Sequence, residues 1–270
     1  MHSSTTGTGD RPPAPGSRFL PGPRPRRIAH RGLALDVPEN TLRAFEAALA
    51  AGADMLETDT RATSDGLALA VHDEDLARLA GDQRRIDELT AAEAGAVRLS
   101  GDEPLAMLED VLGTFRDVPI NIDVKAASAI GPAVAAIART RSADRVCIAG
   151  FDHAVVRRTV RTVQAATGIL PVRSPARPVI ASFLAARAAE APDALIRRLL
   201  APYAALQVPE SYQGLPIVTA ANVAAAHRAG CEVHVWTVDD PVTMRNLLVN
   251  GVDGIISNRV DLLSELIDGE

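Results

Sequence analysis

Apolar runs rich in β-branched residues alternate with alanine-rich stretches along the chain from Ile28 onward. This alternation is typical of a parallel sheet whose strands are joined by helical crossovers. The segment NTLRAFEAALAAG, residues 40–52, shows the helical part of the pattern, because its larger apolar residues recur every three or four positions. Asn40 or Thr41 can cap the start of this helix, and Gly52 can end it.

Eight strand-like segments follow one another at spacings that leave room for helical crossovers. They are residues 26–30, 54–59, 119–125, 145–151, 168–172, 204–208, 232–238 and 252–257. Eight strands with intervening helices predict an α/β fold, a closed TIM (β/α)8 barrel. An open, doubly wound sheet is the alternative.

One further apolar run, LALAVH at residues 67–72, does not fit this pattern. Only about a dozen residues separate Asp59 from His72, and the run LALAVH takes up half of them. A parallel crossover alone needs a dozen or more residues and usually contains a helix. The dipeptide Asp65-Gly66 between them favours a tight turn. We therefore expect a small β-hairpin insertion after the second strand, which brings His72 back to that strand's carboxyl end, where barrel active sites form.

Length and composition fit one domain preceded by a tail. The chain has 270 residues, of which 47% are apolar, and residues 28–270 suit a single barrel domain. Residues 1–27 hold six of the 18 prolines and no apolar run longer than two. We expect a flexible Pro/Gly/Arg-rich tail there, with neither a signal peptide nor a membrane span. Because the later apolar runs are also short, the prediction is a soluble, cytoplasmic protein without a stable membrane anchor.

Charge and cysteine content exclude two further classes of protein. A net charge of −6 argues against a nucleic-acid partner, which would need a basic surface. Cys147 and Cys231 lie far apart in apolar segments, so we expect reduced core residues and no disulfide framework. The sequence does not predict an oligomeric state.

Acidic side chains gather at the ends of two predicted strands. Glu57 and Asp59 lie two positions apart on one face, where two carboxylates repel each other unless a cation or a shared proton relieves them. In NIDVK, the polar residues Asn121, Asp123 and Lys125 alternate with apolar ones. Hard oxygen donors without a nearby cysteine suit Mg²⁺ or Ca²⁺. Alternatively, these residues form an ordinary solvated strand end.

Cationic and aromatic residues share this predicted rim. Lys125 is the only lysine in the chain, and a compact ammonium beside an acid suggests a phosphate or metal site. His30 and His72 each end a strand and are candidates for an acid/base pair, while Arg31 suits bidentate phosphate binding. Trp236 is either a core residue or an apolar wall for a small polyol. The remaining histidines are assigned to the tail (His2), to helix surfaces (His153, His227) and to the core (His234).

In this order, the motifs IAHRG, PENTLRAFEAALAAGADMLETDTRATSDGLALAVHD, NIDVK, VHVWTVDD and GVDGIISN resemble those of the glycerophosphodiester phosphodiesterase family. The resemblance covers the chain from about Ile28 to Leu263 and implies a TIM barrel with a hairpin insertion. It also implies site residues in three groups: His30 and His72 for acid/base catalysis, Glu57, Asp59 and Asp123 for the metal, and Arg31 and Lys125 for the phosphodiester. In three places the sequence departs from the family pattern: Asp123 replaces the usual glutamate, ISN replaces the usual TD, and Met107 replaces the usual threonine in the segment leading into LEDVL.

The predicted function is metal-dependent hydrolysis of a small glycerophosphodiester to glycerol 3-phosphate and an alcohol, with Mg²⁺ or Ca²⁺ as cofactor. Either water or a substrate hydroxyl is the nucleophile, and the sequence does not assign the acid and the base. A second reading is phospholipase D-type cleavage of lysophospholipids, which would need an apolar path to the rim. A metal-dependent lyase and a non-catalytic barrel that binds glycerol phosphate also remain open.

Overall fold

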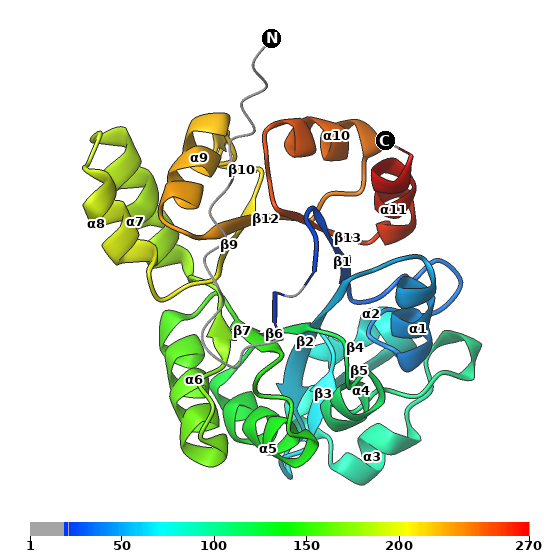
Figure 1. The fold of residues 1–270 in the computed structure, drawn as a ribbon. Coiled ribbons are helices and arrows are strands. Elements are labelled where there is room, and N and C mark those ends of the chain that lie inside the picture. The colour runs from blue at the N-terminus through cyan, green and yellow to red at the C-terminus, as the bar shows by residue number, and fades with distance from the viewer. Residues whose placement is uncertain (1–18, 21, 270) are drawn as a thin grey trace.

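The computed structural model describes residues 19–20 and 22–269, which form a barrel of eight parallel strands with helices outside it (Figure 1). The strand order is β8-β7-β6-β2-β1-β13-β12-β9, and every neighbouring pair in this order is parallel. Within the described chain, β8 and β9 at the two ends of this order do not pair, so the barrel is nearly closed. The predicted α/β barrel is confirmed, and the open doubly wound sheet is not observed.

The eight barrel strands are β1 (Arg26–His30), β2 (Met55–Ala62), β6 (Ile120–Val124), β7 (Val146–Ala149), β8 (Val172–Arg173), β9 (Ala205–Pro209), β12 (Glu232–Trp236) and β13 (Gly254–Ser257). Seven of them lie where the apolar runs predicted them, whereas β8 shares only Val172 with the predicted segment 168–172, in which Ile169 and Leu170 are exposed. The outer helices are α1 (Leu42–Ala50), α4 (Leu108–Thr114), α5 (Ile130–Thr140), α6 (His153–Thr167), α7 (Arg177–Ala188), α8 (Asp193–Leu200), α9 (Ala220–Arg228), α10 (Pro241–Val249) and α11 (Val260–Asp268). Thr41 rather than Asn40 caps α1, because its side chain accepts a hydrogen bond from the backbone N–H of Ala44.

The segment between β2 and α4 is larger than the hairpin that the sequence predicts. Strand β3 (Ala68–Ala70) does return antiparallel to β2. It is followed by β4 (Asp75–Leu76), α2 (Ala77–Ala80), β5 (Asp82–Arg85) and α3 (Ala91–Ala96). Residues of β3, β4, α2 and α3 share a separate hydrophobic cluster. These short elements escaped prediction because polar strands such as DQRR carry no apolar alternation.

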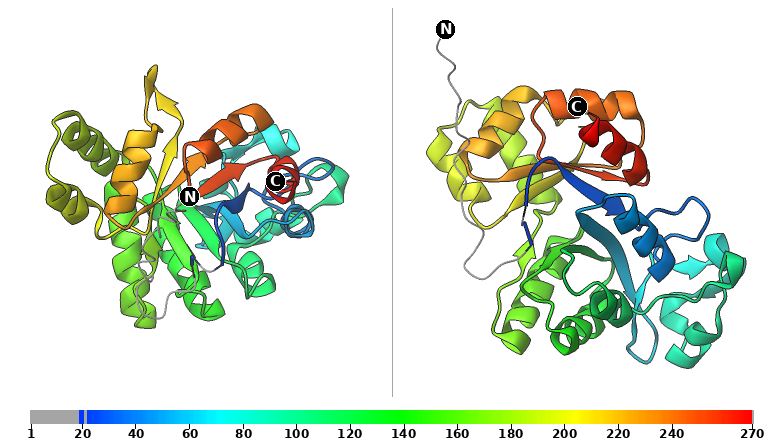
Figure 2. Two further views of the ribbon diagram at one scale, coloured as in Figure 1. Left: turned by 45° about the horizontal axis from the view of Figure 1, so that its top comes forward. Right: turned by 45° about the vertical axis from the view of Figure 1, so that its right-hand side comes forward.

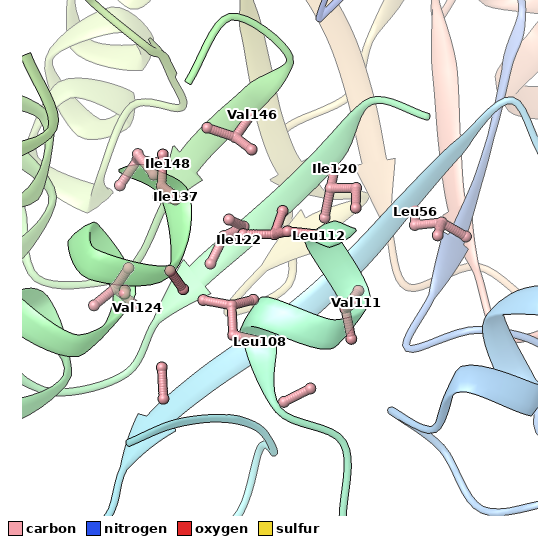
Figure 3. Close-up of a cluster of buried hydrophobic side chains, with 14 of the residues drawn as sticks. Leu56, Leu108, Val111, Leu112, Ile120, Ile122, Val124, Ile137, Val146 and Ile148 are labelled. Atoms are coloured by element: carbon pink, nitrogen blue, oxygen red, sulfur yellow. The ribbon is translucent and has the colours of Figure 1, made fainter. Parts of the chain in front are cut away.

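Most apolar side chains pack between the strands and the outer helices. Figure 3 shows this layer around β6, where Ile120, Ile122 and Val124 pack against α4 and α5 together with Leu112 and Ile137. All of these side chains are at most 3% exposed. Because side chains alternate along a strand, the residues between them must point into the barrel.

The barrel interior is filled near its amino end by a small apolar cluster that includes Phe19, Ile28 and Met55. Phe19 belongs to the predicted flexible tail, yet its side chain is fully buried. The described part of that segment therefore packs against the barrel, and the Phe19 ring covers this end of the interior. Residues 1–18 of the predicted tail lie outside the described residues.

A short hairpin of β10 (Ser211–Tyr212) and β11 (Leu215–Pro216) follows β9. It projects beyond the rest of the chain in the left view of Figure 2, where it is coloured yellow. Across residues 19–20 and 22–269, the helices are too short or too polar to cross a membrane.

Candidate active site

All eight candidate site residues line one cavity at the carboxyl ends of the barrel strands. The cavity has a volume of about 480 Å³ and contains His30, Arg31, Glu57, Asp59, His72, Asp123, Lys125 and Trp236 in its walls. Such a volume lies within the range of small-molecule sites. The structure therefore brings together every residue that the sequence selected.

A tight turn after β1 positions the first two of these residues. His30 is the last residue of β1, and Arg31 and Gly32 follow with φ of 59° and 85°. A Cβ at Gly32 would lie 2.6 Å from the carbonyl carbon of Ala44 in α1, so only glycine fits there. This close approach fixes the direction in which Arg31 leaves the strand.

Asn40 ties the loop after β1 to β2. Its backbone N–H donates to the carbonyl of Arg31 at 2.8 Å, and its side-chain oxygen accepts from the Thr58 hydroxyl at 2.8 Å. The Asn40 side-chain amide lies 3.5 Å from an oxygen of Asp59. Asn40 is 2% exposed, so the PENT motif has a structural part in holding the rim.

The acidic residues meet because β2 and β6 are neighbours in register. Glu57 pairs with Asn121, and Asp59 pairs with Asp123. Because side chains alternate along a strand, the four side chains share the inner face, while Leu56 and Thr58 of β2 and Ile120 and Ile122 of β6 face outward. Asp59 is 1% exposed and Glu57 is 6% exposed.

Two cations compensate the charge of these buried acids. The Lys125 ammonium lies 2.6 Å from Asp59 Oδ1 and 2.7 Å from Asp123 Oδ2, and Arg31 Nε lies 2.8 Å from Asp59 Oδ2. Burial alone would raise the pKa of Asp59, but Lys125 and Arg31 together lower it. Burial, with the neighbouring charges of Asp59 and Asp123, raises the pKa of Glu57 well above its usual value.

The site leaves three buried oxygen atoms without a hydrogen-bond partner: Glu57 Oε2, Asn121 Oδ1 and Asp123 Oδ1. Buried oxygens of this kind are normally satisfied, so these are acceptors available for a ligand. Within the described residues, however, no three His, Cys, Asp or Glu side chains converge as metal ligands would. Both oxygens of Asp59 are in ion pairs, Oδ1 with Lys125 and Oδ2 with Arg31.

His30 is held by an amide whose orientation is fixed. The Asn258 side-chain nitrogen donates to Asp239 Oδ2 at 2.8 Å, so its oxygen faces Nδ1 of His30 at 2.7 Å. Because an amide oxygen only accepts, Nδ1 carries a proton, and Nε2 of the neutral ring is free to accept one. That nitrogen lies 3.9 Å from Glu57 Oε2. Burial and the charge of Arg31 lower the pKa of His30, although the bond to Asn258 opposes them.

His72 is held by a carboxylate instead. Its Nδ1 donates to Asp73 Oδ1 at 2.8 Å, and its backbone carbonyl accepts from Arg61 Nε at 2.8 Å. Asp73 is held in turn by Arg78 of α2, which also binds Glu39. The larger insertion after β2 thus supplies the arginine that orients the partner of His72.

A chain of ion pairs connects the two sides of the cavity. Arg31 donates to Glu39 Oε1 at 3.0 Å, and Arg78 donates to the same oxygen at 2.7 Å. Burial alone would raise the pKa of Glu39, but the hydrogen bond from Arg78 and the charge of Arg31 lower it. The loop after β1 and the insertion therefore share one acidic anchor.

Sequence reasoning missed Asn258, Asp239, Glu39 and Arg78 as parts of the site. Asn258, Asp239 and Glu39 lie in segments that were noted only as motifs. The residue that orients a histidine can come from any part of the chain, so no sequence spacing reveals it. GVDGIISN departs from the usual family pattern at Asn258, so that departure was the available signal.

The remaining aromatic and histidine assignments have mixed outcomes. Trp236 lines the cavity, with its ring edge-on to Phe151 at a centroid distance of 5.9 Å. His234 is fully buried, and its Nε2 lies 3.0 Å from Glu232 Oε2, which agrees with its assignment to the core. His153 begins α6, and His227 lies on α9, where it binds Asp253 at 2.6 Å rather than facing only solvent. His2 lies outside the described residues.

Comparisons with known proteins point in one direction. Residues 30–262 match the model of the glycerophosphoryl diester phosphodiesterase family. The chain is 37% identical over 247 residues to the probable glycerophosphodiester phosphodiesterase 2 of Mycobacterium tuberculosis, covering 89% of each protein. It is also 35% identical over 113 residues to a lysophospholipase D of Homo sapiens, which is 37% of this chain and 36% of that protein.

Solved structures show the same fold. The glycerophosphodiester phosphodiesterase of Thermotoga maritima superposes with a TM-score of 0.66 at 25% identity, over 89% of this chain and 98% of that one. A phosphodiesterase of Oleispira antarctica in complex with the product sn-glycerol-3-phosphate superposes with a TM-score of 0.71 at 20% identity, over 91% and 97% of the two chains.

Proposed function

Because this chain belongs to the glycerophosphoryl diester phosphodiesterase family and is a phosphoric diester hydrolase, we propose that it cleaves glycerophosphodiesters by a two-histidine mechanism at the cavity described above. The products are glycerol 3-phosphate and an alcohol. The observation that carries the proposal is the convergence of His30, Arg31, His72 and Lys125 in one cavity with three acids.

The hydrogen-bond partners of the two histidines suggest different roles. His30 faces the cavity with an unprotonated Nε2, because Asn258 accepts the proton of Nδ1. It therefore acts as the base that takes a proton from the nucleophile, whether water or a substrate hydroxyl. His72 is held by the Asp73 carboxylate, which compensates the charge of a ring protonated at both nitrogens. It therefore acts as the acid that protonates the leaving alcohol.

Arg31 and Lys125 are proposed to bind the non-bridging oxygens of the phosphodiester. Both are already anchored on Asp59 and point into the cavity, so their charges are oriented before the substrate arrives. Burial lowers the pKa of Lys125, but Asp59 and Asp123 more than offset this and raise it. The ammonium therefore stays charged at neutral pH and can oppose the charge that develops on phosphate.

A divalent cation, Mg²⁺ or Ca²⁺, is proposed to be held by Glu57, Asp59 and Asp123. The partnerless oxygens of Glu57 and Asp123 fit such a hard cation, and that of Asn121 lies on the same face. Asp59 joins them only by releasing Lys125 or Arg31. The cation would supply Lewis-acid stabilisation of the phosphodiester oxygens when bound.

The proposal is tested by measuring glycerophosphocholine hydrolysis with and without a chelator. We expect His30→Ala and His72→Ala each to lower kcat by on the order of 10²-fold or more, as loss of a general base or acid does. His153→Ala, on α6 outside the cavity, is the matched control and should keep wild-type activity. Full activity in either site variant would rule out the assigned pair, and full activity in the chelator would rule out the metal.

A cytoplasmic location is also retained as a proposal. Cys147 and Cys231 are both buried and neither is in a disulfide, as in a protein that does not depend on disulfides. Fractionation of cells that make the protein would test the location.

A further inference from the structure

One polar side chain in the cavity wall has no part in the proposed chemistry. Gln207 lies on β9 and lines the cavity, although it is only 6% exposed. Within the described residues, its Nε2 is a buried atom without a hydrogen-bond partner. A buried amide in this condition costs free energy until something pairs with it, so we expect a ligand of the cavity to do so.

The strand fixes the direction of this side chain. Leu206 and Val208, on either side of Gln207, belong to the hydrophobic cluster between β9 and the outer helices. Because side chains alternate along a strand, Gln207 points into the barrel. On the neighbouring strand β12, Gln207 is in register with His234, and Trp236 lies two residues further on. The Gln207 amide and the Trp236 ring therefore line the cavity from adjacent strands.

Gln207 lies inside the cavity rather than at its mouth. Ile256 also lines the cavity and belongs to the apolar cluster at the amino end of the barrel, so that cluster forms the cavity floor. Tyr212 and Leu215, which line the mouth, are 55% and 72% exposed, whereas Gln207 is 6% exposed. The part of a substrate that reaches Gln207 must therefore be small and enclosed.

The position of β9 shows which part of the substrate this is. In the circular strand order, β9 is four places from β2, and strands four places apart in an eight-stranded barrel face each other. His72 follows β3, which pairs with β2. If His72 protonates the leaving alcohol, the head group lies on the His72 side, and the glycerol that keeps the phosphate lies on the β9 side.

The chemistry of an amide selects the group that it binds. A side-chain amide offers both a donor and an acceptor, and a hydroxyl can pair with either of them. One hydroxyl of the retained glycerol lies on the carbon next to the phosphate-bearing carbon, and so stays close to the phosphate. The other is at the far end of the glycerol and extends away from the phosphate, towards β9.

We propose that Gln207 is a specificity-determining residue, whose amide forms a hydrogen bond with the terminal hydroxyl of the retained glycerol while the Trp236 ring packs against the glycerol carbons. The inference rests on the proposed function of the site and adds a residue that selects its substrate. A phosphodiester without this hydroxyl leaves the buried amide unpaired, so the site discriminates against it.

The test compares two choline esters with the purified full chain in the presence of Mg²⁺ or Ca²⁺. Choline release is measured from glycerophosphocholine and from 2-hydroxypropyl phosphocholine, in which a hydrogen replaces the terminal hydroxyl of the glycerol. The hydroxyl next to the phosphate-bearing carbon is present in both. We expect kcat/KM to be higher for glycerophosphocholine by about tenfold or more. Equal values would overturn the inference while leaving the proposed function standing.

Gln207→Met assigns this discrimination to one side chain, because methionine has nearly the same shape and cannot replace the amide hydrogen bond. The ratio of the two kcat/KM values should fall to near one. The matched control is Gln164→Met on α6, which is exposed and outside the cavity and should keep the wild-type ratio. A wild-type ratio in Gln207→Met would overturn the inference.

Thermal unfolding without substrate separates substrate binding from a structural role. Removing an amide that has no partner in the fold should leave the Tm of Gln207→Met equal to that of the wild type or above it. A clearly lower Tm, together with an equal loss of activity on both esters, would show that the amide supports the fold and would overturn the inference. If the wild-type protein releases choline from neither ester, the proposed function itself fails and the inference fails with it.

Discussion

Gly32 offers a sharp test of how the first strand and its helix fix the catalytic rim. A Cβ added there would lie 2.6 Å from the carbonyl carbon of Ala44 and 2.7 Å from its Cβ, at a backbone φ of +85°. Gly32→Ala therefore combines two penalties. The left-handed conformation costs roughly 1–2 kcal/mol for any L side chain, and the clash with α1 costs roughly 1–3 kcal/mol as overpacking.

Gly66 separates the two penalties, since its φ of +89° is nearly the same but a Cβ there would meet nothing within 4 Å. We expect Gly66→Ala to lower the free energy of unfolding by roughly 1–2 kcal/mol and Gly32→Ala to lower it by about 2–5 kcal/mol. Urea denaturation followed by circular dichroism measures both changes under the same conditions.

Activity gives a second readout of the same pair. Relief of the clash at Gly32 must move β1 against α1, and His30 and Arg31 move with the strand end. We therefore expect Gly32→Ala to lose kcat/KM for glycerophosphocholine and Gly66→Ala to keep it. Equal losses of stability in the two variants, or full activity in Gly32→Ala, would refute the close-packing argument.

Three further predictions follow from the polar contacts. Asn258→Ala removes the acceptor of the His30 Nδ1 proton, so kcat should fall about tenfold, which is the contribution of one such hydrogen bond. Because that bond raises the pKa of His30, its loss should move the acid limb of the pH–rate profile to lower pH. A shift to higher pH would contradict this. Lys125→Met leaves buried carboxylates without their cation and should cost about 3 kcal/mol of unfolding free energy in urea titrations; an unchanged midpoint would contradict it. The hydrogen bond to Asp253 raises the pKa of His227 above 6.5, so this contact stabilises the fold fully below that pH, and the stabilisation is lost as pH rises through the raised pKa. His227→Gln should therefore lose less stability than wild type as pH rises from about 6.5 through that raised pKa, as thermal unfolding would show, and an equal loss in the two proteins would contradict this.

Seven of the barrel strands were predictable because each is a short apolar run between helical segments. The exception is β8, a two-residue strand that begins at the last residue of the predicted segment 168–172. The hairpin strand β3 was predictable for a different reason. The stretch from Asp59 to His72 is too short to hold both a helical crossover and a parallel strand, so an antiparallel return was expected. The rest of the insertion was not, because β4, β5 and α2 are short and polar, and ion pairs such as Arg85 with Asp87 contribute no periodic signal.

The site residues were predictable as a set but not in their contacts. Alternation along β2 and β6 was enough to place Glu57, Asp59 and Asp123 on one inner face. It could not show that Lys125 lies between the two aspartates, because that depends on the register of neighbouring strands. Phe19 was misassigned to a free tail because one buried aromatic ring in a proline-rich stretch leaves no pattern.

A crystal structure of the protein with glycerol 3-phosphate tests the central claim most directly. The account predicts the phosphate in the cavity, within about 3 Å of the Arg31 and Lys125 nitrogens, with the Nε2 atoms of His30 and His72 facing it. A phosphate bound elsewhere, or one that contacts His30 while the ring of His72 points away, would contradict it.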